Sequence, residues 1–152
     1  MNAFPNIRQH LPSLVVAVAM VSFVVPAVAD DLKFKLSGDM EVPPVATEAV
    51  GDAAIRIKPD MSVSGKLTTR GMVGTMAHIH MGGAGINGPV VITLSRSGDQ
   101  LWTVPEDSKL GAAEYKAYLA GELYVNVHSA DHRSGEIRGQ LVPPAADTKY
   151  SY

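Results

Sequence analysis

Short stretches in which apolar and polar residues alternate recur along this chain, and Gly, Pro and Asp separate them. A period of two is typical of strands that bury one face, because successive side chains on a strand point to opposite sides. We expect strands at residues 32–36, 53–57, 62–67, 90–94, 123–127 and 136–141. Two neighbouring pairs of these strands look like antiparallel hairpins, one of them around the turn at 58–61.

Several strands at short spacing, with turn signals between them, predict a mainly β fold: an antiparallel Greek-key-like β-sandwich or barrel. One segment differs from this pattern. Residues 108–119 carry apolar side chains near helical spacing, begin with Ser108 as a plausible N-cap and end before Gly121. They predict one short helix across an end of the sandwich.

The first 29 residues have the features of an export signal. Arg8 is the only fixed charge in them, residues 11–25 are nearly all apolar, and Ala27-Val28-Ala29 has the pattern that a signal peptidase reads. An uncleaved anchor helix is the alternative, but an apolar run of about 15 residues is short for a bilayer. We therefore predict a cleaved signal peptide (1–29), one domain (30–142) and a mobile C-terminal tail (143–152), in a periplasmic or secreted protein with no membrane contact after cleavage.

The composition argues against a nucleic-acid partner and excludes cysteine as a metal ligand. All 15 acidic residues lie after residue 29, and no basic patch suited to nucleic acid is visible. The chain has no cysteine, so the exported domain must be stable without disulfides, and a metal site would have to use His, Met or carboxylate ligands.

Four of the five histidines form two short clusters, His78 with His80 and His128 with His132. The i, i+2 spacing of the first pair puts both imidazoles on one face of a strand. His128 ends a strand-like run and His132 follows in an apparent turn, so both rings could reach a common point. Four imidazoles suit copper or zinc. The alternative is that the imidazoles serve a buried hydrogen-bond network.

Four blocks of the sequence form a recognisable pattern: 36–44 (LSGDMEVPP), 77–80 (AHIH) with 88–91 (GPVV), 123–128 (LYVNVH) and 135–141 (GEIRGQL). Together they resemble the CHRD domain, a family named from repeats in chordin, an extracellular antagonist of growth factors. The resemblance implies the fold rather than a function. It covers His78, His80 and His128, but His132 matches no motif of the family.

The segment 77–80 is also similar to the His-x-His element that supplies two copper ligands in Cu/Zn superoxide dismutases. The zinc loop of those enzymes has no counterpart here, so such a site would hold copper alone. We favour copper over zinc because copper leads the usual affinity order at nitrogen sites, because the protein is expected outside the cytoplasm, and because Met72, Met76 and Met81 lie near the histidines. Met81 points to the opposite strand face from His80 unless the strand breaks at Gly82.

Other residues near the histidines are candidates for supporting roles. Tyr124 and Asn126 share the strand face of His128 and could hydrogen-bond to ligand imidazoles, or simply form the polar face of the sheet. Arg133 and Arg138 could both draw a small anion toward a bound metal. Because Arg138 and Glu41 belong to the family blocks, we expect these two residues to serve the fold instead.

These observations lead to one main hypothesis and two alternatives. The main one is an exported copper-binding protein with copper-only superoxide dismutase activity. In it His78, His80 and His128 bind the metal, His132 completes the site or transfers a proton, and Arg133 attracts the superoxide anion. The alternatives are a non-catalytic copper carrier or buffer, and an extracellular interaction module whose histidines are structural.

Overall fold

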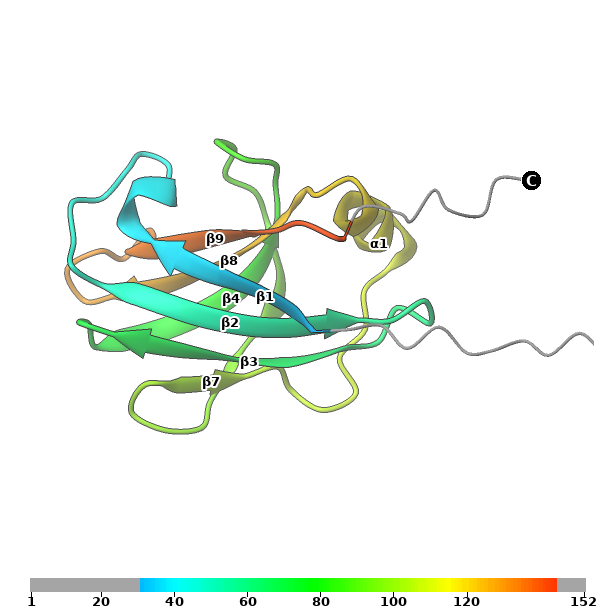
Figure 1. The fold of residues 1–152 in the computed structure, drawn as a ribbon, viewed down its shortest axis with the longest axis horizontal. Coiled ribbons are helices and arrows are strands. Elements are labelled where there is room, and N and C mark those ends of the chain that lie inside the picture. The colour runs from blue at the N-terminus through cyan, green and yellow to red at the C-terminus, as the bar shows by residue number, and fades with distance from the viewer. Residues whose placement is uncertain (1–30, 145–152) are drawn as a thin grey trace, which may run out of the picture.

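The computed structural model describes residues 31–144, so the predicted signal peptide and residues 145–152 of the predicted tail lie outside the described residues. The described residues form one nine-stranded sheet in the order β5-β4-β8-β9-β1-β2-β3-β7-β6, and each neighbouring pair is antiparallel (Figure 1). The strands are β1 (Leu32–Ser37), β2 (Val50–Ile57), β3 (Val63–Arg70), β4 (Gly74–Met81), β5 (Val90–Thr93), β6 (Ser95–Arg96), β7 (Leu101–Thr103), β8 (Leu123–Ser129) and β9 (Ile137–Leu141). A 3-10 helix, η1 (Gly38–Met40), follows β1, and the helix α1 (Ala112–Leu119) precedes β8.

The sheet curls until its two edges nearly meet. Only Leu94 separates the edge strands β5 and β6 in the chain, and its N–H donates to the carbonyl oxygen of Ala77 at 2.9 Å. The guanidinium of Arg96 in β6 donates to the carbonyl oxygen of Gly74 in β4 at 3.2 Å. The chain therefore passes directly from one edge of the sheet to the other. The predicted mainly β, antiparallel, barrel-like architecture is confirmed.

The core lies inside the curled sheet, where the alternating apolar residues meet. The side chains of Leu36, Ile55, Leu67, Ile79 and Val125 are completely buried there. Strand β2 shows the alternation most clearly, since its buried residues occupy every second position. This is the pattern that a period of two predicts for a strand with one face in the core.

All six predicted strands are present, with bounds that differ by a few residues. Both hairpins are present too, since β2 pairs with β3 and β8 pairs with β9. The β2–β3 hairpin turns at Met61, whose φ of 65° lies in the left-handed region. The alternation did not reveal β4, because four consecutive residues of it (77–80) are buried. It did not reveal β6 and β7 either, because strands of 2 and 3 residues are too short to display a period.

The predicted helix begins later than expected. It spans Ala112–Leu119 with Gly111 as its N-cap residue, so the assignment of Ser108 as the N-cap was wrong. The hydroxyl of Ser108 donates instead to the carbonyl oxygen of Pro105 at 2.7 Å. Its carbonyl oxygen accepts the N–H of Val63 at 2.8 Å, so this segment pairs with the β2–β3 hairpin and the helix cannot include it. No helix in residues 31–144 is long and apolar enough to cross a membrane.

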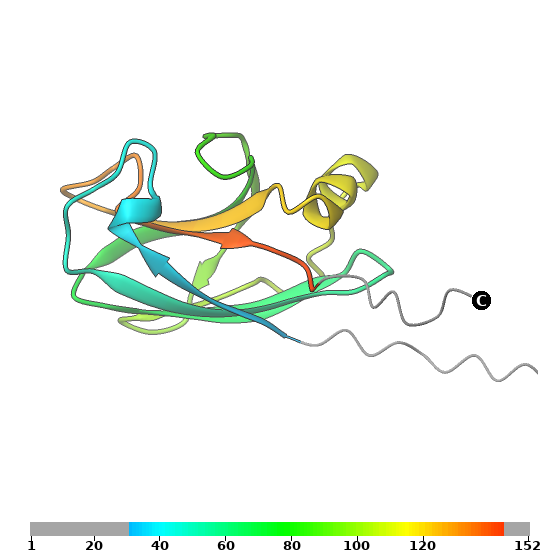
Figure 2. The ribbon, with the colours of Figure 1, turned by 45° about the horizontal axis from the view of Figure 1, so that its top comes forward.

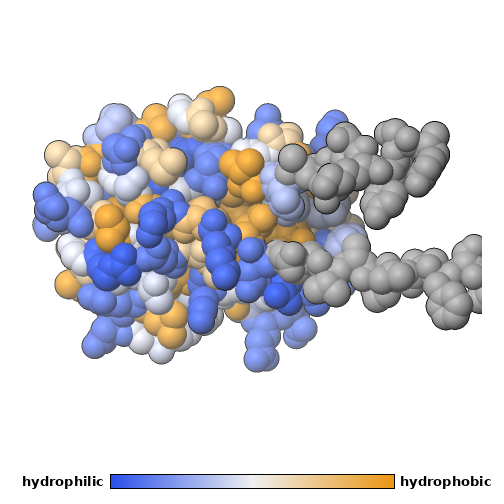
Figure 3. Space-filling view, in the orientation of Figure 1, coloured by the Kyte–Doolittle hydropathy of each residue, from blue (hydrophilic) through white to orange (hydrophobic). Residues whose placement is uncertain are grey.

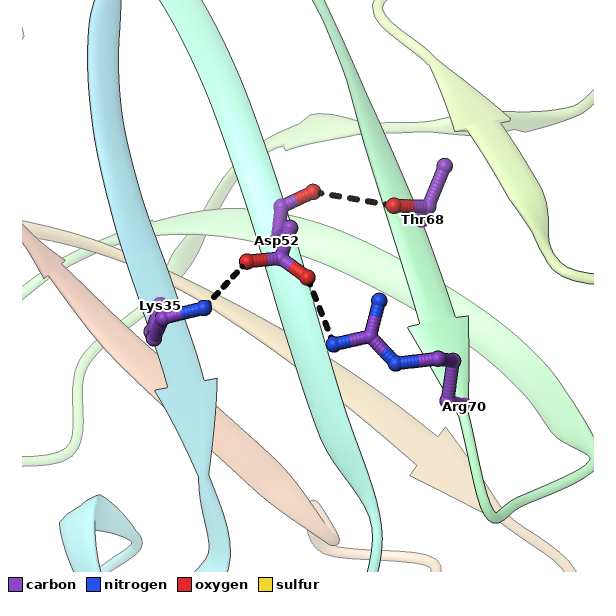
Figure 4. A network of polar contacts seen from close by, with 4 residues as sticks. All are labelled: Lys35, Asp52, Thr68 and Arg70. Carbon is purple, nitrogen blue, oxygen red and sulfur yellow. Dashed lines mark hydrogen bonds and ion pairs between the residues drawn. The ribbon is translucent and has the colours of Figure 1, made fainter.

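The outward face of β1, β2 and β3 is charged and open to solvent. Hydrophilic side chains cover much of this face in Figure 3, which views the molecule from the side of these strands. Asp52 in β2 accepts from Lys35 at 2.7 Å and from Arg70 at 2.8 Å (Figure 4), and these contacts hold the pKa of its carboxyl below the usual value. Charges on this face are therefore solvated or paired across neighbouring strands.

Strand β8 differs from the other strands because all seven of its residues are buried. One side of β8 faces the core, and the other carries Tyr124, Asn126 and His128. The segment containing η1 and the loop 82–89 lie on the same side of β8 and β9, as Figure 2 shows in cyan and green. The polar face of β8 is therefore covered by chain rather than by solvent, and the histidines lie on this covered face.

Candidate metal centre

Three histidines from two neighbouring strands come together. His78 and His80 lie on the outward face of β4, and His128 lies on the same face of β8. One ring nitrogen from each imidazole lies within 4.8 Å of the others. The side chains are at most 9% exposed. This group could hold a metal ion.

The hydrogen bonds of the rings fix which nitrogen is free. Nδ1 of His80 lies 2.9 Å from the carbonyl oxygen of Gly88, and Nδ1 of His128 lies 2.9 Å from that of Arg133. Because a carbonyl oxygen can only accept, each Nδ1 must carry the proton, and each Nε2 keeps its lone pair. Metal-binding histidines are commonly oriented in this way, through the nitrogen that does not bind the metal.

One hydrogen bond joins two of the rings, and in residues 31–144 one ring nitrogen of the third has no partner. Nε2 of His128 accepts from Nδ1 of His78 at 2.9 Å, so Nε2 of His78 is deprotonated. Within the described part of the chain, Nε2 of His80 is buried and has no hydrogen-bond partner. A buried acceptor without a partner is costly, and a cation among the three rings would satisfy it. The donor set therefore fits a metal ion.

Burial favours the neutral form of His78 and His80. Desolvation first, and then the charges that His128 and His80 would carry, lower the pKa of His78 from 6.5 to about 4. Burial is also the main cause that lowers the pKa of His80. Neutral imidazole is the form that binds a metal. His78 and His80 are thus uncharged at neutral pH, which is the state that a metal ligand requires.

Acidification should destabilise the metal-free protein. The folded state resists protonation of His78, whereas the unfolded chain accepts a proton near its ordinary pKa of 6.5. The resulting stabilisation is complete above pH 6.5 and is lost as the pH falls toward about 4. It amounts to at most about 3 kcal/mol. Urea unfolding at pH 7 and pH 4.5 should show a larger loss for the unchanged protein than for His78→Gln, and equal losses would contradict the prediction.

The loop 82–89 closes one side of the cluster and is tied to it through Gly88. The N–H of Gly88 donates to the hydroxyl of Tyr124 at 3.2 Å, and its carbonyl oxygen accepts from His80. The ring of Tyr124 stacks on that of His80, with centroids 4.8 Å apart and planes 5° from parallel. The side chains of His80 and Tyr124 thus stack on each other, and both hydrogen-bond to the backbone of Gly88.

Gly88→Ala should weaken metal binding although it changes no ligand. A Cβ at Gly88 would collide with the backbone carbonyl of Met81, so the loop must move and the bond to His80 must break. We expect a loss of about 10- to 100-fold in metal affinity, as for other partners of metal ligands. Gly83→Ala is the matched control, because a Cβ there would meet only Glu122 at 3.9 Å. Equal affinities for the two variants in a metal titration would refute this role of Gly88.

His132 does not join the three histidines. In residues 31–144 the histidine cluster contains His78, His80 and His128 alone. His132 is partly exposed, and its backbone carbonyl accepts from the N–H of Ser129 at 3.3 Å in the turn after β8. The i, i+4 spacing therefore does not bring the two rings to one point here. The assignment of His132 as a ligand or proton carrier stays a prediction.

Arg133 contributes its backbone rather than its side chain to the cluster. Its carbonyl oxygen accepts from His128, while its side chain is exposed. Its role in attracting an anion stays a prediction. Sequence reasoning missed the backbone acceptors of Gly88 and Arg133, since a carbonyl oxygen has no signature in the residue type.

The three methionines differ in their position relative to the histidines: Met76 and Met81 lie on opposite faces of β4, and Met72 precedes the strand. Met76 lies on the face of the histidines, opposite His128 in the strand register, and is 48% exposed. Met81 and Met72 are half-buried and pack against the core. Of these three thioethers, Met76 is thus the one placed beside the cluster, and Met81 points away from it as the strand period predicts.

A family model agrees with this architecture. The model of the CHRD domain matches residues 32–141, and the chain belongs to the CHRD domain family. No curated protein and no solved structure shows significant similarity to the chain. The predicted family is thus confirmed, whereas the likeness of 77–80 to the copper-binding element of superoxide dismutases stays a prediction.

Proposed function

We propose that this protein binds copper through His78, His80 and His128 after export to the periplasm or beyond. The observation that carries the proposal is the orientation of the imidazoles. Two of them donate Nδ1–H to backbone carbonyls, and the buried Nε2 of His80 has no hydrogen-bond partner in residues 31–144. Export is supported by the signal-like sequence of residues 1–29.

Copper fits this donor set better than zinc. Divalent copper binds nitrogen ligands most tightly among the first-row divalent ions, and a thioether favours Cu(I). Met76 places a thioether on the strand face that carries the histidines. Closed structural zinc sites usually take four protein ligands, whereas three imidazoles converge here.

Superoxide dismutation is the reaction that we propose for a copper-loaded form. Copper supplies one-electron chemistry when bound. The protein residues would hold the metal with three neutral imidazoles, which leaves a coordination position for a small anion. Arg133, exposed beside the carbonyl that orients His128, is the proposed side chain for attracting the anion. His132 in the same turn is the proposed proton carrier.

A copper carrier without catalytic activity is the second candidate, and the histidine burial favours it. The three rings are at most 9% exposed, whereas Met76 at the same face is 48% exposed. An exposed thioether beside the three buried imidazoles would be a ligand through which Cu(I) enters and leaves the site. An extracellular interaction module, the third reading, would use the histidines only for hydrogen bonds.

A copper titration combined with a superoxide assay separates these functions. The dismutase predicts one tightly bound copper and faster loss of superoxide by the loaded protein, with both reduced in His78→Ala. The carrier predicts tight binding without acceleration. The interaction module predicts that copper neither binds tightly nor stabilises the fold, and that result would refute the proposed function.

A further inference from the structure

A buried arginine lies behind one of the three histidines. Arg138 in β9 is 1% exposed, and its Cζ lies 3.5 Å from the centroid of the Tyr124 ring. Strand β8 lies between β4 and β9, so Arg138 and His80 approach Tyr124 from opposite sides. A guanidinium, a phenol ring and an imidazole therefore form a three-layer stack that ends at the metal centre.

The same guanidinium holds the loop that orients His80. It donates to the carbonyl oxygen of Gly83 at 2.8 Å, to that of Ile86 at 3.1 Å and to Oδ1 of Asn87 at 3.3 Å. This loop carries Gly88, whose carbonyl oxygen accepts from Nδ1 of His80. Both features that orient this imidazole, the stack and the hydrogen bond, thus depend on Arg138.

Arg138 also brings a positive charge close to the cluster. In residues 31–144 no carboxylate forms an ion pair with it within 4.0 Å, and the attraction to the buried Glu41 acts at longer range. Because little water screens charges in the interior, a buried cation acts on a neighbouring metal more strongly than a surface one. Such a charge favours the metal oxidation state of lower charge.

We propose that Arg138 is a positioning residue of the metal centre, which fixes Nε2 of His80 and favours Cu(I) over Cu(II). This inference rests on the proposed function, since it concerns copper held by the three histidines. Arginine suits the role better than lysine, because only its planar fork can bond several fixed acceptors while stacking on a ring.

Three variants separate geometry from charge. Arg138→Lys keeps the positive charge but loses the planar guanidinium that bonds several acceptors, whereas Arg138→Met loses both the charge and the guanidinium. Arg96→Met is the matched control. Arg96 donates to three backbone carbonyls and its Cζ lies 5.7 Å from the centroid of the Trp102 ring, yet it reaches β4 only at Gly74. Competitive titrations with chelators of known affinity would measure Cu(I) and Cu(II) binding for each protein.

We expect both Arg138 variants to lose about 10- to 100-fold in copper affinity, and Arg96→Met to lose none. In Arg138→Lys the losses for Cu(I) and Cu(II) should be similar. In Arg138→Met the loss should be larger for Cu(I), which is equivalent to a lower reduction potential. A folded Arg138→Met protein with unchanged affinities for both ions would overturn the inference alone. Failure of the unchanged protein to bind copper would overturn the proposed function and this inference together.

Tyr124→Phe, a milder change, tests the same positioning of His80 if Arg138→Met does not fold. Tyr124→Phe keeps the ring stack but removes the hydroxyl that accepts from Gly88. We expect about a tenfold loss of copper affinity. In the metal-free protein, the nitrogen NMR signals of His80 should lose the pattern of a single Nδ1–H tautomer. Unchanged affinity together with an unchanged tautomer would contradict the inference.

Discussion

Replacing any one of His78, His80 or His128 with alanine should reduce copper affinity at least 100-fold. This exceeds the roughly 10- to 100-fold loss that follows removal of a residue that only supports a ligand. One ring nitrogen of each imidazole lies within 4.8 Å of the others, so each substitution removes one of three nitrogen ligands. A competitive copper titration measures the loss, and circular dichroism shows that each variant is folded.

His132→Ala is the matched control for these variants. It removes an imidazole from the same segment of chain, yet its ring is outside the cluster formed by described residues. The three-histidine account predicts that its copper affinity stays within about twofold of the unchanged protein. A loss as large as that of His128→Ala would contradict the account and identify His132 as a fourth ligand.

Copper should stabilise the folded protein strongly, because the three ligands come from β4 and β8 and meet only when these strands pair. A ligand that binds the native state alone adds about 2.7 kcal/mol at a free concentration of 100 times its dissociation constant. For a domain of this size that corresponds to an increase in Tm on the order of 10 °C. Thermal unfolding followed by circular dichroism, with and without one equivalent of copper, measures the shift.

Two controls make this stability test specific. A chelator should return the Tm to that of the metal-free protein. His80→Ala should show no increase with copper, because it lacks the Nε2 that is buried without a partner in the described structure. An equal increase in His80→Ala would place the copper elsewhere on the molecule and contradict the proposed site.

The strand period explains how much of the fold could be predicted. The sequence pattern located six of the nine strands in residues 31–144 but not β4. The period of two still placed His78 and His80 on one face and Met81 on the other. It could not give the order of strands in the sheet. That order brings β4 beside β8, although about 40 residues separate them in the chain, and it depends on packing between distant segments.

The site was predicted where the residue type carries the chemistry. His78, His80 and His128 were identified because imidazoles are recognisable ligands. The sequence also placed Tyr124 on their face, but it did not show that Tyr124 stacks on His80 or that Arg138 lies behind it. Those contacts arise from the register of β8 and β9, in which Asn126 lies opposite Arg138.

His132 illustrates the limit of spacing arguments. A separation of four residues brings side chains together on a helix, but after a strand the outcome depends on the turn. Here the backbone carbonyl of His132 accepts from the N–H groups of Ser129 and Gly135, and the turn closes without bringing its ring to the cluster.

Electron paramagnetic resonance of the copper-loaded protein tests the central claim most directly. The full chain would be purified from the compartment to which it is exported, analysed for metal, and measured in the Cu(II) state. The account predicts one copper per chain with nitrogen hyperfine structure from three imidazoles, and a changed spectrum in His78→Ala but not in His132→Ala. A protein that carries no copper and shows only weakly bound, non-imidazole Cu(II) after loading would contradict it.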